Sequence, residues 1–104
     1  MIQELNVNNF DQEINKYKPV VVEFYTTACS HCKKLAGALN KLSEEKGDDV
    51  FFGKCNIDQE ALLQSRFDIS AVPTLLFIKN GEIKNRLVGE VHPLIIQEEI
   101  KKLA

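Results

Sequence analysis

The chain has 104 residues, of which 44% are hydrophobic and 27% charged, and this balance predicts one soluble globular domain over residues 1–104. Its 13 basic and 15 acidic residues are interspersed and give a net charge of −2, which argues against a nucleic-acid partner. The apolar runs are far shorter than the roughly 20 residues needed to span a bilayer, so a membrane protein is excluded as well.

A short strand and a short helix are predicted at the start of the chain. Residues 2–7 alternate weakly between apolar and polar side chains, as a strand does. Asn8 or Asn9 can then cap a helix, because asparagine is a favoured N-cap residue. This helix would end before Pro19 and would carry on one side Phe10, Ile14 and Tyr17.

The following segment predicts a buried strand and then a long helix. Val20–Tyr25 is a near-continuous run of apolar β-formers, which is typical of a central parallel strand covered on both faces. Residues 32–46 change to a helical period, and Gly47 is positioned to end that helix. Residues 50–56 predict another strand, and residues 59–67 a short helix.

The last third of the chain predicts a hairpin and a closing helix. Thr74–Lys79 reads as a strand, Asn80-Gly81 as a two-residue turn, and residues 83–88 as the antiparallel partner strand. Apolar residues recur at helical spacing over 94–103, after Pro93. The order βαβαβαββα indicates an α/β fold, in which helices flank both faces of a central mixed β-sheet.

The segment Cys29-Ser30-His31-Cys32 follows the predicted central strand and opens the long helix. A thiol at a helix N-terminus is stabilised as a thiolate by the helix dipole and by free backbone N–H groups. Cys29 is therefore expected to be the exposed nucleophile. Cys32 falls inside the first turn and is expected to be the buried resolving thiol, which attacks a mixed disulfide at Cys29.

Around this cysteine pair, the sequence resembles the thioredoxin family over its full length. The matching features are the strand ending in Glu23-Phe24-Tyr25, the C-x-x-C motif followed by Lys33, the segment Lys54-x-Asn56-Ile57-Asp58, Val72-Pro73-Thr74, Asn80-Gly81 and Gly89. The resemblance implies the thioredoxin fold and the reduction of protein disulfides by thiol–disulfide exchange. It also implies a thioredoxin reductase as electron donor, with neither a cofactor nor a metal.

Glu23 is the most informative single residue, because a carboxyl group within an apolar strand is costly to bury and its pKa is expected to be raised. In the family, this position usually holds an aspartate that exchanges a proton with the second cysteine, here Cys32, and Glu23 is one methylene longer. Lys54 resembles the family's partner of that acid. The alternative interpretation is a purely structural, satisfied ion pair between Glu23 and Lys54.

The resemblance also implies a substrate-binding surface beside the cysteines. The family has a cis peptide bond before the proline that corresponds to Pro73, and the backbone at Val72 would pair with an extended substrate segment. Small residues would let a substrate approach at Ala28 and Gly89.

The sequence departs from the family pattern in two further places, before the first cysteine and between the two cysteines. Ala28 replaces the usual tryptophan, and Ser30-His31 replaces the usual Gly-Pro between the cysteines. A histidine before the second cysteine resembles the disulfide isomerases and periplasmic oxidases, and an imidazolium there would favour the Cys29 thiolate and the reduced form. An isomerase or oxidase-like protein with a more oxidising potential therefore remains an alternative, as does a redox-inert interaction module.

Other interpretations of the cysteines and histidines are disfavoured. A zinc site would need ligands from Cys55, His31 or His92, but the chain has no second C-x-x-C or H-x₃-H motif. Cys55 is expected to be a small buried hydrophobe, and His92 a helix-entry residue before Pro93. The odd number of cysteines and the lack of an apolar leader predict a cytoplasmic protein, which we expect to be a monomer.

Overall fold

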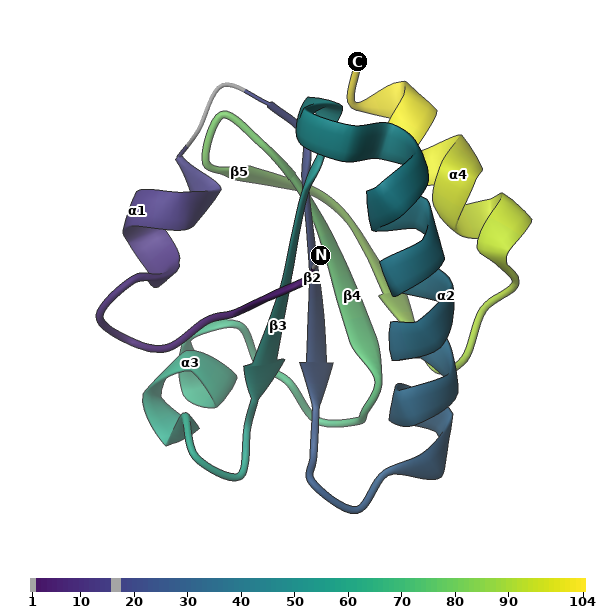
Figure 1. Ribbon diagram of the computed structural model, residues 1–104. Coiled ribbons are helices and arrows are strands. Elements are labelled where there is room, and N and C mark those ends of the chain that lie inside the picture. Colours follow the sequence, from purple (N-terminus) through teal and green to yellow (C-terminus); the bar gives the residue numbers. More distant parts are fainter. Residues whose placement is uncertain (1, 16–17) are drawn as a thin grey trace.

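A five-stranded mixed sheet forms the centre of the computed structural model, which describes residues 2–15 and 18–104 (Figure 1). The strands lie in the order β1-β3-β2-β4-β5. Their bounds are Gln3–Glu4 for β1, Val20–Tyr25 for β2, Phe51–Asn56 for β3, Thr74–Lys79 for β4 and Glu82–Val88 for β5. Strands β1, β3 and β2 are parallel, whereas β4 runs antiparallel to both β2 and β5. The predicted mixed sheet is confirmed.

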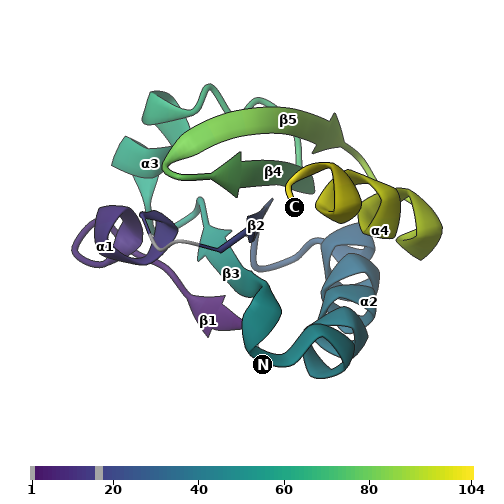
Figure 2. The same ribbon diagram turned by 90° about the horizontal axis from the view of Figure 1, so that it is seen from above.

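Helices cover both faces of this sheet (Figure 2). On one face lie α1 (Phe10–Ile14) and α3 (Ala61–Arg66), and on the other lie α2 (Ser30–Lys46) and α4 (Pro93–Lys102). Successive side chains of a strand point to opposite faces, so β2 contributes to two cores. Val20, Val22 and Phe24 face α1 and α3, while Val21 packs with the leucines of α2 and the isoleucines of α4.

The first strand is shorter than the predicted 2–7 because asparagine side chains divert the backbone into a turn. Asn6 Oδ1 accepts hydrogen bonds from the N–H groups of Asn8 (2.8 Å) and Asn9 (3.1 Å). Asn9 does occupy the N-cap position of α1, but its side chain accepts from Asn6 N instead of from the helix. Tyr17, predicted to lie on the same side as Phe10 and Ile14, is outside the described residues.

Two further boundaries differ from the predictions. Helix α2 begins at Ser30 instead of Cys32, because Cys29 is its N-cap, and after Lys46 the chain continues as a single 3₁₀ turn, η1 (Gly47–Asp49). Helix α3 spans only part of the predicted 59–67. The predicted hairpin turn is confirmed, with positive φ angles of 53° at Asn80 and 78° at Gly81, as a type I′ turn requires.

The topology brings two loops together at one end of the sheet. The chain leaves β2 at Tyr25 and enters α2 through the cysteine motif, and it enters β4 through Val72-Pro73. Because β4 is antiparallel to β2, with Phe24 opposite Thr74, the end of β2 and the start of β4 lie at the same edge. No helix of the described residues is long and apolar enough to cross a membrane.

Candidate active site

Cys29 and Cys32 form a disulfide at the N-terminus of α2, with their Cα atoms 5.2 Å apart. Cys29 is the N-cap residue, and its Sγ accepts a hydrogen bond of 3.2 Å from the backbone N–H of Cys32. Cys29 is half-buried, whereas only 2% of Cys32 is exposed. A thiolate at Cys29 would therefore lie at the positive end of the helix dipole, and it is the more accessible of the two sulfurs.

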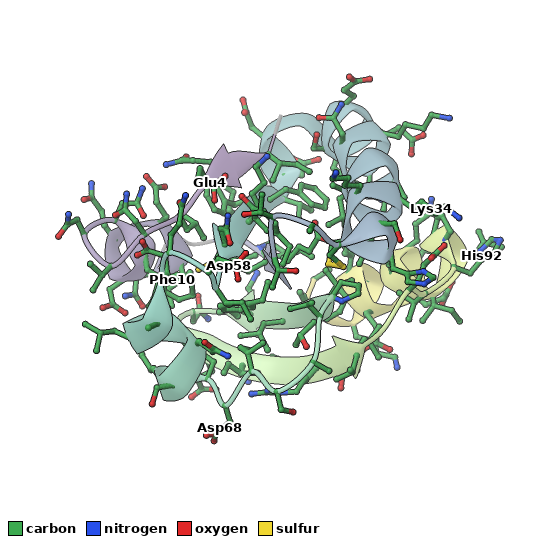
Figure 3. All side chains as sticks on the ribbon, turned by 90° about the horizontal axis from the view of Figure 1, so that it is seen from below. Glu4, Phe10, Lys34, Asp58, Asp68 and His92 are labelled. Carbon is green, nitrogen blue, oxygen red and sulfur yellow. A yellow bond between two sulfur atoms is a disulfide. The ribbon has the colours of Figure 1, made fainter. Side chains whose placement is uncertain are left out.

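The loop that carries Cys29 is held by residues at the end of β3. Asp58 Oδ2 accepts a hydrogen bond from Thr27 N (3.0 Å), and Asn56 Nδ2 donates to Thr27 Oγ1 (3.1 Å). Asn56 Oδ1 in turn accepts from Asp58 N (2.9 Å). Figure 3 labels Asp58 in a view from below Figure 1, which is the end of the sheet where β2 and β3 finish. The sequence placed Asn56 and Asp58 in the family motif, but their common partner Thr27 emerged only from the structure.

The segment before β4 forms one wall of a groove beside the cysteines. The Val72–Pro73 peptide bond is cis, as the resemblance implied, and Pro73 O accepts a hydrogen bond of 2.8 Å from Gly89 N. The groove has a volume of about 640 Å³, and its lining includes His31, Val72, Pro73, Gly89, Glu90 and His92. Three of the four residues predicted to bind substrate, Val72, Pro73 and Gly89, therefore line this groove. Ala28 is exposed and is not part of this lining.

Glu23 is buried on the face of the sheet that α2 covers, with 1% of the residue exposed. Burial raises the pKa of its carboxyl group to about 8, and the positive charge of Lys54 opposes part of that rise. Its Oε2 atom has no hydrogen-bond partner among the described residues. A cavity of about 70 Å³ has both Glu23 and Cys32 in its lining, so the buried acid and the buried cysteine border the same small space.

Lys54 does not form the satisfied ion pair with Glu23 that was one interpretation of the sequence. The two residues are register partners on β2 and β3. Among the described side chains, however, the Lys54 ammonium lies within ion-pair distance only of Glu4, whose Oε1 is 3.8 Å from Nζ. A half-exposed carboxylate is a less costly partner than a buried one, because it keeps part of its hydration.

His31 forms a hydrogen bond with a residue that the sequence did not single out. Its Nδ1 lies 2.6 Å from Oε1 of Glu90, in the loop after β5. The hydrogen bond from His31 lowers the pKa of Glu90, so the carboxylate accepts and the ring N–H donates. The sequence indicated the position of Glu90 only indirectly, because Glu90 follows Gly89, which was predicted to lie at the substrate-binding surface.

The remaining cysteine and histidine lie where the sequence predicted. Cys55 is a free, buried cysteine in β3, and burial is the main cause that raises the pKa of its thiol to about 12. His92 is the N-cap of α4, where its Nδ1 accepts from Leu94 N (3.1 Å) (Figure 3). No cluster of three or more histidine, cysteine or acidic side chains suited to a metal ion occurs among residues 2–15 and 18–104.

Comparison with known proteins gives a consistent result. The family model described as Thioredoxin matches residues 1–102. Thioredoxin-1 of Saccharomyces cerevisiae is 37% identical over 93 residues, covering 89% of this chain and 88% of the yeast protein. Thioredoxin M-type, chloroplastic, of Pisum sativum is 29% identical over 102 residues, and the chain spans 97% of its own length but only 59% of the pea protein. The crystal structure of oxidised mitochondrial thioredoxin 3 from S. cerevisiae superposes with a TM-score of 0.87 at 30% identity, covering 98% of this chain and 95% of that one.

Proposed function

The chain belongs to the thioredoxin family, and from this premise we propose that it is a dithiol/disulfide oxidoreductase that reduces disulfide bonds in proteins. The observation that carries the proposal is the position of Cys29 at the N-cap of α2, with the buried Cys32 as its disulfide partner. This arrangement combines an accessible, thiolate-stabilising site with a second thiol held within reach of the first.

The proposed reaction begins with the reduced protein. The Cys29 thiolate attacks one sulfur of a substrate disulfide, that S–S bond breaks, and the other substrate sulfur leaves as a thiolate. Cys32 loses its proton and attacks Cys29 Sγ, which breaks the mixed disulfide and releases the second substrate sulfur. The two cysteines give up two electrons to the substrate disulfide and become the Cys29–Cys32 disulfide. Of the two protons that the substrate sulfurs take up, one is released by Cys32 and the other comes from solvent.

Glu23 is proposed to take the proton of Cys32 in the second step. The carboxyl group and the buried sulfur share one small cavity, and its volume of about 70 Å³ is sufficient for a bridging water. The raised pKa of about 8 makes Glu23 a stronger base than an exposed glutamate and keeps proton exchange possible near neutral pH. Lys54 is proposed to modulate this proton affinity from the neighbouring strand.

The groove beside the cis Val72–Pro73 bond is proposed to bind an extended substrate segment. Its lining includes the apolar Val72 and Pro73 as well as His31 of the cysteine motif, and strand-like pairing with the Val72 backbone would present a disulfide to Cys29. Gly89, whose N–H bonds to Pro73 O, also lines the groove. Ser30 and His31, between the cysteines, are proposed to adjust the potential of the couple.

The electron donor, compartment and assembly state are further parts of the proposal. We propose a thioredoxin reductase as donor, because the disulfide must be reduced again after each turnover. A cytoplasmic location is proposed from the free, buried Cys55 and the odd cysteine count, although the relatives include a chloroplast protein. The protein is proposed to act as a monomer.

Trapping of a mixed disulfide tests the proposal. The Cys32→Ser variant, reduced and then mixed with insulin, should form a covalent adduct at Cys29 that dithiothreitol releases. Cys29→Ser should neither form this adduct nor reduce insulin, and Cys55→Ala should keep full activity as the matched control. An adduct on Cys32 in Cys29→Ser, with none on Cys29 in Cys32→Ser, would reverse the two roles.

A further inference from the structure

Three ionisable side chains form a row that leads from the edge of the sheet to the buried acid. Glu4 on β1 is the register partner of Lys54 on β3, and Lys54 is the register partner of Glu23 on β2. Partners on adjacent strands point to the same face, so all three side chains lie on the face that α2 covers. The Lys54 ammonium is thus placed between two carboxyl groups of very different exposure.

The ammonium is anchored at the outer end of this row. Its Nζ lies 3.8 Å from Glu4 Oε1 and 5.8 Å from the centre of the Tyr25 ring, which adds a cation–π contact. The Tyr25 hydroxyl donates to both carboxylate oxygens of Glu4, each at 2.9 Å, and so holds that carboxylate beside the lysine. Figure 3 shows Glu4 at the outer edge, on β1.

Glu23, at the inner end, has no comparable partner among the described residues. The small cavity beside Glu23 is also lined by three other titratable residues, Cys32 and Lys33 of α2 and Tyr25 of β2. On β4, the register partner of Glu23 is the apolar Leu75. Glu23 is 1% exposed, whereas the side chains of Lys54 and Glu4 are 38% and 50% exposed. Moving the ammonium inward would cost hydration that the outer pair retains.

We propose that Glu4 is a positioning residue for the proton relay, which holds Lys54 away from Glu23 with the help of the Tyr25 hydroxyl. The inference rests on the proposed function, in which Glu23 takes the proton of Cys32. Glu4 touches neither cysteine and acts only through Lys54. Without Glu4, the ammonium is free to approach Glu23, and the carboxylate form of Glu23 becomes more favourable.

The test follows the protonation of Glu23 directly, by a pH titration of its side-chain carboxyl ¹³C signal in the oxidised protein. Glu4→Gln should lower the pKa of Glu23 by about half a unit, a threefold loss of proton affinity, which is the size expected for a partly exposed ion pair. Glu44→Gln removes the same charge from an exposed position of α2 and should leave the signal unchanged.

A double substitution decides whether Glu4 acts through Lys54. Lys54→Met should raise the pKa of Glu23, and adding Glu4→Gln to it should cause no further change. An unchanged titration in Glu4→Gln, or an equal shift with and without Lys54, would overturn the inference. The titration involves no turnover, so its result is separate from the proposed function, whose failure would appear as the absence of the Cys29 adduct.

Discussion

The Nδ1 atom of His31 lies 2.6 Å from Oε1 of Glu90, a residue 59 positions later in the chain. His31 belongs to the first turn of α2, and Glu90 to the loop that links β5 to α4. The pair places a negative charge directly beside the imidazole expected to favour the Cys29 thiolate. The effect of His31 on the cysteine couple is therefore partly offset by Glu90.

Replacing His31 by proline should make the protein a stronger reductant. Proline is tolerated in the first turn of a helix, and the substitution removes the imidazole that is expected to favour the Cys29 thiolate and the reduced form. We expect the potential at pH 7 to become more negative by no more than about 20 mV, from a starting value between about −270 mV, typical of thioredoxins, and about −180 mV, typical of protein disulfide isomerase. Equilibration with glutathione measures this shift.

The control is His92→Asn, which removes the other imidazole of the groove but keeps a side chain suited to capping α4. Its potential should equal that of the unmodified protein. At high pH, where imidazole is neutral, His31→Pro and the unmodified protein should converge. An unchanged or less negative potential in His31→Pro at pH 7 would contradict the role given to His31.

Glu23→Leu should be more stable than the unmodified protein at neutral and higher pH, but slower in turnover. The pKa of Glu23 is raised from 4.5 to about 8 in the folded state, so the folded protein binds the extra proton between these values. The contribution of Glu23 to stability therefore falls as pH rises from about 4.5 to about 8 and does not change above that range. The leucine variant should lack this fall, with an advantage of a few kcal/mol by pH 8.5.

Urea unfolding of the oxidised proteins at pH 4.5, 7 and 8.5 measures this difference. Glu44→Leu, at an exposed position of α2, serves as the control and should keep the pH dependence of the unmodified protein. A leucine variant that is less stable at every pH, with an unchanged rate of insulin reduction, would mean that Glu23 is only a structural residue.

Gly89→Ala should impair the reduction of protein disulfides more than that of small disulfides. Gly89 has a φ of +92°, which strains an alanine, and an added Cβ would meet no atom within 4 Å. The cost to stability is therefore backbone strain of about 1–2 kcal/mol. The methyl group would project beside the groove, so KM for insulin should rise while the rate with a small aromatic disulfide is retained.

Gly37→Ala is a matched control, because Gly37 lies within α2 and its added Cβ also meets no atom within 4 Å. This substitution should stabilise the helix by about 0.5–1 kcal/mol and leave KM unchanged. Equal losses with both kinds of substrate in Gly89→Ala would indicate damage at the cysteines instead of at the groove.

Cys55 should resist alkylation as long as the protein is folded. Burial raises the pKa of its thiol to about 12, so very little thiolate exists at pH 8, and the side chain is inaccessible. In a Cys29→Ser/Cys32→Ser double variant, iodoacetamide at pH 8 should react only after unfolding in guanidinium. Rapid labelling of the folded variant, measured by mass spectrometry, would show that the β3 strand opens or that Cys55 has a redox role.

The features predicted best from the sequence are those that depend only on residues close to one another in the chain. The start of a helix at the cysteine motif, the two-residue turn at Asn80-Gly81 and the entry to α4 at His92 each follow from the conformational preferences of a few residues. The run Val20–Tyr25 has the bounds of β2, because a strand covered on both faces needs apolar side chains throughout. The first strand was overestimated, because the Asn6 side chain competes for the backbone hydrogen bonds.

The pairing of charged groups could not be predicted from the sequence, because it depends on how the strands associate. Glu4 contacts Lys54 because β1 pairs with β3 in one particular register, and a shift by one residue would turn the side chain to the other face. His31 meets Glu90 because the antiparallel β4 and β5 return the chain to the end of the sheet where α2 begins. The cysteine pair and the buried acid could be identified from the sequence, because their signals are a local motif and a carboxyl group within an apolar run. Their electrostatic surroundings depend on long-range strand pairing, which no local preference encodes.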